Sequence, residues 1–146
     1  MEKRIKMDEL LPDAMKSMYN LAVTTGKSNL THIQQELIKI RASQLNGCAF
    51  CIDMHTKDAL KYGETHQRIF LLNAWRETNL FTEDEKALLA VTEEVTLISQ
   101  HGLTNNTYNE ALKHFSEETL AQIIMSVVVI NSWNRIAVSS HKQVPQ

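Results

Sequence analysis

Four residues in the segment 36–55 have the types and the spacing that thiol redox chemistry requires. They are Glu36, Cys48, Cys51 and His55. Two thiols in a Cys-x-x-Cys pair can cycle between a dithiol and a disulfide. An imidazole one helical turn beyond the second thiol can accept its proton, either directly or through a water. The set predicts a thiol-based redox site.

The cysteine pair lies where one predicted helix ends and the next begins. Asn46-Gly47 ends a helix that begins after Thr31, and a new helix opens near Cys48. Exposed amides and the dipole at a helix N-terminus stabilise a thiolate, so we expect at least one thiol pKa below the free value of about 8.5. At about 100° per residue, both cysteines and His55 share one face of this helix.

Glu36 is placed on the preceding helix, beside the apolar residues Ile33 and Ile40. Partial burial there would raise the pKa of its carboxyl group toward the range useful for proton transfer. We therefore expect Glu36 and His55 to move protons for the thiols.

Each of these residues also has a simpler interpretation. The cysteines can be small buried side chains, His55 a partly buried helix residue, and Glu36 a partner for Lys39 on a solvated face. A zinc site is a second hypothesis, in which both cysteines and His55 join Glu36 or His32 as ligands. Ligands crowded on one helical turn, however, rarely converge on one tetrahedral centre. A third hypothesis is a non-catalytic redox sensor or interaction protein whose disulfide alters an interface.

Capping signals and apolar periodicity divide the whole chain into helices. Thr31 with Gln34, and Thr82 with Glu85, have the spacing of capping boxes, and Ser116 caps a long final helix. The expected helices cover about 7–25, 31–45, 48–62, a segment from 65, 82–101, 108–115 and 117–139. With only four Gly and two Pro to interrupt them, these helices predict a single all-α domain over residues 1–146.

The composition is that of a globular protein, with 43% hydrophobic and 22% charged residues. A net charge of −2 without a basic block argues against a nucleic-acid partner. The N-terminal residues lack the apolar core of a signal peptide, and the apolar run 123–133 is shorter than the roughly 20 residues that cross a bilayer. We expect a cytoplasmic protein with no membrane partner.

Two predicted helices are apolar on more than one face. Residues 69–72 are an unbroken apolar run, and the run 123–130 is interrupted only by Ser126. Such helices must be surrounded, yet a small domain has few interior helices to surround them. A second copy of the chain is the commonest cover, so we expect a closed homo-oligomer.

The order of Glu36, Cys48, Cys51 and His55 resembles the motif of the AhpD-like alkylhydroperoxidases, within the carboxymuconolactone decarboxylase superfamily. The flanking segments 40–47 and 52–56, and the segment 131–135 in the last helix, are also similar. The best-known AhpD proteins carry a His directly before the second cysteine. This sequence has Phe50 there, so any relay by that His is absent. Members that decarboxylate the lactone lack the cysteine pair, whose presence here argues against that reaction.

The resemblance implies an all-α AhpD-like fold and a thiol-dependent peroxidase with an antioxidant role. Cys51 would attack a hydroperoxide oxygen and become a sulfenic acid, which Cys48 would resolve to a disulfide. Glu36 and His55 would relay the protons. The one-turn spacing to His55 favours Cys51 as the attacking thiol, although the residues alone leave that choice open. No haem, flavin or metal would be needed. The family also implies a lipoyl or thioredoxin-like dithiol as reductant, and trimers or hexamers built from dimers.

Overall fold

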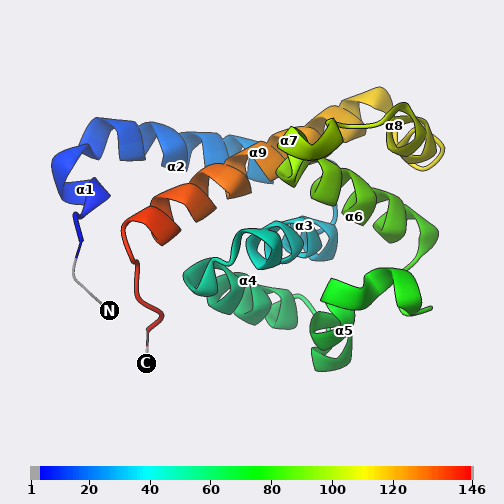
Figure 1. Ribbon diagram of the computed structural model, residues 1–146, viewed down its shortest axis with the longest axis horizontal. Helices are drawn as coiled ribbons and strands as arrows, with labels where there is room; N and C mark the ends of the chain where they lie inside the picture. Colours follow the sequence, from blue (N-terminus) through cyan, green and yellow to red (C-terminus); the bar gives the residue numbers. More distant parts are fainter. Residues whose placement is uncertain (1–3, 146) are drawn as a thin grey trace.

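The structure, a computed structural model, describes residues 4–145, and the regular elements among them are all helical (Figure 1). This confirms the all-α prediction. The elements are α1 (Met7–Leu10), α2 (Pro12–Gly26), α3 (His32–Asn46), α4 (Ala49–Lys61), α5 (His66–Leu71), the 3₁₀ helix η1 (Leu72–Glu77), α6 (Glu83–Thr96), α7 (Ile98–His101), α8 (Asn105–Ala111) and α9 (Glu117–Ser139).

Helix α3 is the centre of the core. It packs against α4, α6 and α9, and its side chains Leu37, Ile38 and Ile40 are fully buried. Figure 1 shows α2 and α9 running side by side above α3 and α4, with α5 and α6 at the other end of the molecule. The elements that carry the candidate residues are therefore held at the centre of the fold.

Most helix ends follow the capping residues that the sequence predicts. Thr31 and Gln34 form a capping box at the start of α3, and Ser116 caps α9 by accepting a hydrogen bond from the Thr119 N–H. Gly47 takes a left-handed conformation at φ 66°, which a side chain would disfavour, and this closes α3. Helix α4 can then begin at Ala49, directly after Cys48.

Several helix boundaries differ from the sequence-based expectation. The helix expected over 7–25 is divided at Leu11 (φ −133°), because the following Pro12 disfavours the helical conformation in the residue before it. The helix expected over 82–101 ends at Thr96, and the short α7 follows. Helix α8 begins before Tyr108, because Thr104 caps it by accepting from the Thr107 N–H.

Helix α9 is long and apolar enough, by length and composition alone, to cross a membrane. In the structure it packs against α2, α3, α4 and α6. Its buried amides Asn131 and Asn134 form hydrogen bonds with side chains of other helices. These contacts identify α9 as a core helix, whose apolar character is explained by the protein interior.

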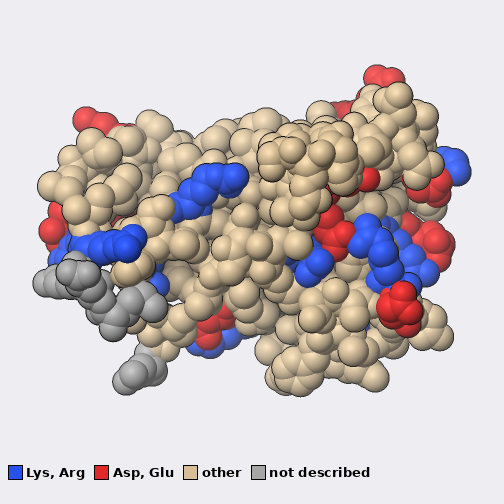
Figure 2. Space-filling model, in the orientation of Figure 1, with Lys and Arg blue, Asp and Glu red and all other residues tan. Residues whose placement is uncertain are grey.

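Some apolar side chains nevertheless remain on the surface. In the run 69–72, Ile69 and Leu72 are buried but Phe70 is 73% exposed, and Met125 and Val128 on α9 are each about 40% exposed. On the face shown in Figure 2, charged side chains of both signs gather mainly toward the two ends and the middle is largely uncharged. Neither sign forms a continuous patch on this face.

Candidate active site

Cys48 and Cys51 form a disulfide at the N-terminus of α4. Cys48 is the N-cap residue, and its sulfur accepts a hydrogen bond of 3.3 Å from the Cys51 backbone N–H. Both residues are buried, at 0% and 2% exposure. Once the disulfide opens, this amide and the helix dipole will favour negative charge on the Cys48 sulfur.

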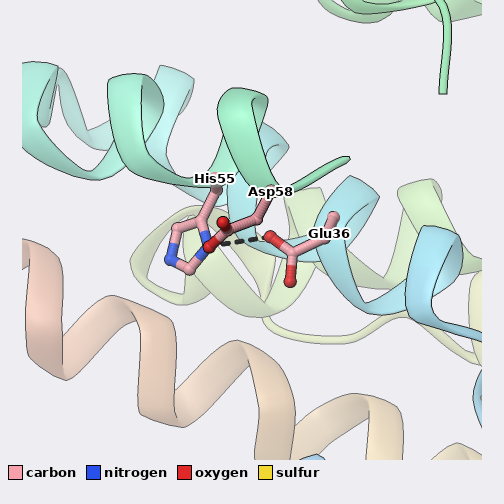
Figure 3. Close-up of side chains that lie close together, drawn as sticks. All are labelled: Glu36, His55 and Asp58. Carbon is pink, nitrogen blue, oxygen red and sulfur yellow. Dashed lines mark hydrogen bonds and ion pairs between the residues drawn. The ribbon is translucent and has the colours of Figure 1, made fainter. Parts of the chain in front are cut away.

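His55 and Glu36 meet across the interface of α4 and α3. The Nδ1 atom of His55 lies 2.8 Å from Oε2 of Glu36, and the Lys39 ammonium lies 2.6 Å from Oε1 of the same carboxylate. Glu36 and His55 are both buried. Figure 3 shows the two side chains pointing toward each other, with Asp58 beside them and the second ring nitrogen of His55 turned away from Glu36.

The electrostatic state of Glu36 differs from the sequence-based expectation. Burial pushes the pKa of Glu36 upward, as expected, but the hydrogen bond from His55 and the charge of Lys39 outweigh it and leave the pKa below its ordinary value. The expected raised pKa is therefore wrong. An ionised carboxylate can only accept hydrogen bonds, so Nδ1 of His55 is the donor and Nε2 is left for proton exchange.

A zinc centre at the cysteines is not what this geometry assembles. Glu36, His55 and Asp58 are the only group within residues 4–145 that offers three ligand atoms within 4.8 Å, and it contains neither cysteine. The disulfide leaves no thiolate in this form. Both oxygens of Glu36 accept from His55 and Lys39, and Asp58 pairs with Lys61 at 2.7 Å. His32, the other proposed ligand, instead stacks on the Tyr62 ring.

A cleft of about 710 Å³ gives access to one side of the cysteine pair. Cys51, His55 and Lys39 lie on its wall, whereas Cys48 and Glu36 do not. Most of the remaining wall is apolar and comes from α2, α4 and α9, including Met15, Tyr19, Phe50, Met54, Ile130 and Trp133. The structure thus places all four predicted residues together but exposes only Cys51 and His55 to the cleft.

Sequence reasoning did not predict the contacts that aromatic and basic residues make in the cleft. Tyr19 and Trp133 are in contact, with ring centroids 4.9 Å apart, although they lie near opposite ends of the chain. Phe50, at the position where the resembled proteins carry a His, is half-buried and has the Lys142 ammonium 4.5 Å from its ring centroid. Such pairs have no local sequence signal, because only the fold brings the segments together.

A buried amide network fixes the turn that carries the cysteines. The Asn46 amide donates to Asn131 (3.0 Å) and Asn134 (2.9 Å) on α9, and the Asn134 amide donates to the Ser43 hydroxyl at 2.9 Å. Asn46 directly precedes Gly47. Because satisfied buried networks rigidify their surroundings, this one holds the end of α3, and with it Cys48, against α9.

Known proteins similar to this chain identify its family. The family model described as the carboxymuconolactone decarboxylase family matches residues 9–94. The chain is 43% identical over 139 residues to the uncharacterised protein YdfG of Bacillus subtilis, and the match covers 95% of each chain.

Solved structures extend this likeness to the whole fold. A protein of unknown function from Agrobacterium tumefaciens, for which a role as the antioxidant defence protein AhpD has been suggested, superposes with a TM-score of 0.96 at 39% identity over 99% of both chains. A peroxidase-related protein from Ralstonia eutropha (TM-score 0.85, 16% identity, covering 96% of this chain and 75% of that one) and the debrominase Bmp8 (0.77, 19%, 92% and 72%) share the fold. The chain therefore belongs to the carboxymuconolactone decarboxylase family and has its AhpD-like helical fold.

Proposed function

We propose that the protein is a thiol-dependent peroxidase with an antioxidant role, which reduces organic hydroperoxides through the Cys48/Cys51 dithiol–disulfide cycle. One observation carries the proposal. Cys51 shares the wall of a large cleft with His55, whose ring is bonded to the buried Glu36 carboxylate, while Cys48 lies fully buried behind it. A substrate in the cleft meets one sulfur and one imidazole, which is what attack on an O–O bond requires.

In the first step, Nε2 of His55 takes the thiol proton of Cys51, and Glu36 stabilises the imidazolium that forms. The Cys51 thiolate attacks the outer oxygen of the hydroperoxide. An S–O bond forms, the O–O bond breaks, and the departing alkoxide takes the proton from His55 and leaves as an alcohol. Cys51 is now a sulfenic acid.

In the second step, the Cys48 thiol attacks the sulfur of that sulfenic acid. The disulfide forms, and the hydroxyl group leaves as water with the thiol proton. An external dithiol then attacks the Cys51 sulfur, which lines the cleft, and expels Cys48. The second thiol of the donor breaks the resulting mixed disulfide, so the donor leaves as a disulfide and Cys51 regains its thiol. Cys48 is the leaving thiolate, and the hydrogen bond from the Cys51 N–H suits it to that role.

The size of the cleft favours organic substrates over hydrogen peroxide. Hydrogen peroxide needs little more room than a water molecule, whose share of liquid volume is about 30 Å³. A cleft of about 710 Å³ with Met15, Tyr19 and Trp133 on its wall suits a bulky apolar group beside the hydroperoxide. A lipoyl or thioredoxin-like dithiol is the proposed reductant and the cytoplasm the proposed location, because dithiol donors are kept reduced there.

Single turnover of the reduced protein tests the proposal. One equivalent of cumene hydroperoxide is expected to consume two thiols per chain and to yield one equivalent of cumyl alcohol, faster than hydrogen peroxide is consumed. Continued turnover with a dithiol then separates an enzyme from a redox sensor, which would react once and stop. Thiol loss without alcohol formation would exclude the peroxidase reaction.

A further inference from the structure

We propose that Lys39 is a positioning residue of this site, which acts through its ion pair with Glu36 to hold His55 in the orientation and tautomer that leave Nε2 for Cys51. The catalytic consequence rests on the proposed peroxidase function. The effect of Lys39 on Glu36 and His55 does not, and it can be measured separately.

The two oxygens of Glu36 have different partners on different helices. Oε1 accepts from Lys39, three residues along the same helix α3, and Oε2 accepts from His55 on α4. The Glu36 side chain is only 6% exposed and Lys39 is 28% exposed. Lys39 also lies on the cleft wall with His55, so its ammonium stands beside the place where a substrate would bind.

The surroundings of Glu36 make a neighbouring cation necessary. Burial opposes ionisation of the carboxylate, and Asp58 on α4 brings a second carboxylate into the same cluster. Asp58 has its own partner, Lys61. Among the basic side chains of residues 4–145, Lys39 and His55 are the two that pair with Glu36. Its charge therefore offsets the burial of Glu36.

A second ion pair with the same spacing shows why burial matters. Glu83 and Lys86 are also three residues apart on one helix, and the Lys86 side chain is 30% exposed, close to the value for Lys39. Glu83, however, is 74% exposed, and its charge is solvated without help. Exposed pairs of this kind contribute little to stability, whereas a buried carboxylate depends on its partner.

Without the ammonium, Glu36 would protonate at a higher pH. A protonated carboxyl group can donate its proton to Nδ1 of His55 in a hydrogen bond, which favours the opposite tautomer with the proton on Nε2. In that tautomer Nε2 cannot accept the Cys51 proton. The loss of proton transfer from Cys51 is greatest at acidic pH. The acid side of the pH profile of activity therefore moves to higher pH when Lys39 is neutralised.

The test compares Lys39→Met with Lys39→Arg, which keeps the charge, and with Lys86→Met as the matched control. The titration of the Glu36 carboxyl is followed by ¹³C NMR, with Glu36→Gln to assign its resonance, and the His55 tautomer by ¹⁵N NMR. In Lys39→Met the Glu36 midpoint is expected to rise by about one pH unit or more. Lys39→Arg and Lys86→Met are expected to titrate as the wild type does. The acid limb of the pH profile of cumene hydroperoxide turnover should move to higher pH together with the Glu36 midpoint.

An unchanged Glu36 midpoint and His55 tautomer in Lys39→Met would overturn the inference, and so would failure of Lys39→Arg to restore them. Lys39→Gln provides a second neutral variant if thermal unfolding shows that the methionine variant is not folded. If the NMR changes appear but the wild type consumes no hydroperoxide, the proposed function fails while the role of Lys39 in the proton relay stands.

Discussion

His55 Nδ1 lies 2.8 Å from Glu36 Oε2, although the two residues are 19 positions apart and belong to different helices. The chain reverses at the left-handed Gly47, and α3 and α4 pack against each other. Glu36 lies about three turns before this reversal and His55 about two turns after it. The same turn that starts α4 at the cysteines therefore also brings the carboxylate to the imidazole.

This pair should control the rate of the thiol chemistry without controlling the fold. Glu36→Gln and His55→Gln are each expected to slow hydroperoxide reduction by about two to four orders of magnitude, as is typical of a positioned proton-transfer group. Stopped-flow kinetics with cumene hydroperoxide measures the rate, and circular dichroism checks that the helices remain. A wild-type rate in Glu36→Gln would show that the carboxylate has no role in proton transfer.

Substitution of the two cysteines should have different effects on the reaction with hydroperoxide. Because Cys51 lines the cleft and Cys48 does not, Cys51→Ser is expected to abolish hydroperoxide consumption. Cys48→Ser is expected to react once and stop at a sulfenic acid, which dimedone traps and mass spectrometry detects. A trapped sulfenic acid on Cys48 in the Cys51→Ser protein, instead, would reverse the two roles.

Reduction of the disulfide should reveal an activated thiol. The Cys48 sulfur sits at the helix N-terminus and accepts the Cys51 N–H, an arrangement that stabilises a thiolate. We expect at least one of the two thiols to be alkylated by iodoacetamide with an apparent pKa below the free value of about 8.5. Alkylation rates measured against pH for each single-cysteine variant show which thiol has the lowered pKa. Two thiols that titrate as free cysteine does would contradict the activation.

Much of the site could be predicted because its signals are local. Capping residues such as Thr31, the stop at Gly47 and the spacing of the cysteines and His55 lie within short segments, and the structure bears them out for the helices. The charge state of Glu36 could not be predicted. It depends on the balance between burial and two partners, and the expectation that counted burial alone had the wrong sign.

The contacts in the cleft and in the amide network also could not be predicted from the sequence. Tyr19 and Trp133 contact each other, and Asn46 reaches Asn134, only because α9, the last helix of the chain, packs against α2 and α3. The segment 131–135 resembled the family, but resemblance alone assigned no task to its amides. Their partners became clear only from the packing.

The amide network should support both stability and the site. Asn134 is 1% exposed and joins Asn46 to Ser43, so Asn134→Ala leaves buried polar groups without partners. A loss of about 1–3 kcal/mol in the free energy of unfolding is expected. Because the network holds the turn before Cys48, the rate of thiol oxidation should fall as well. Urea unfolding and stopped-flow kinetics measure the two effects, and an unchanged oxidation rate would separate the network from the site.

A partly buried carboxylate on α6 should make the fold sensitive to acid. Glu93 accepts from Arg41, Arg76 and the Trp75 indole N–H; burial raises its pKa, but these partners outweigh it and hold the pKa below the ordinary value. A lowered folded-state pKa gives stability that is present above the unfolded value of about 4.3 and is lost as the pH falls through the folded value. Glu93→Gln should be less stable at pH 7 and lose less stability on acidification. Urea unfolding followed by tryptophan fluorescence at pH 7 and pH 3 tests this.

Exposed apolar residues on α9 point to assembly of the chain into oligomers. Met125 and Val128 are one turn apart and about 40% exposed each, on a helix whose other faces are covered by α2, α3, α4 and α6. We propose that a second copy of the chain covers them, as the apolar pattern predicts. Sedimentation equilibrium at micromolar concentration should then give a mass above 16.7 kDa. Val128→Lys should shift the distribution toward the monomer, because a charge would be buried at the interface, whereas Val128→Thr should shift it far less. A wild-type protein that sediments only as a 16.7 kDa species would show that these side chains stay in contact with water.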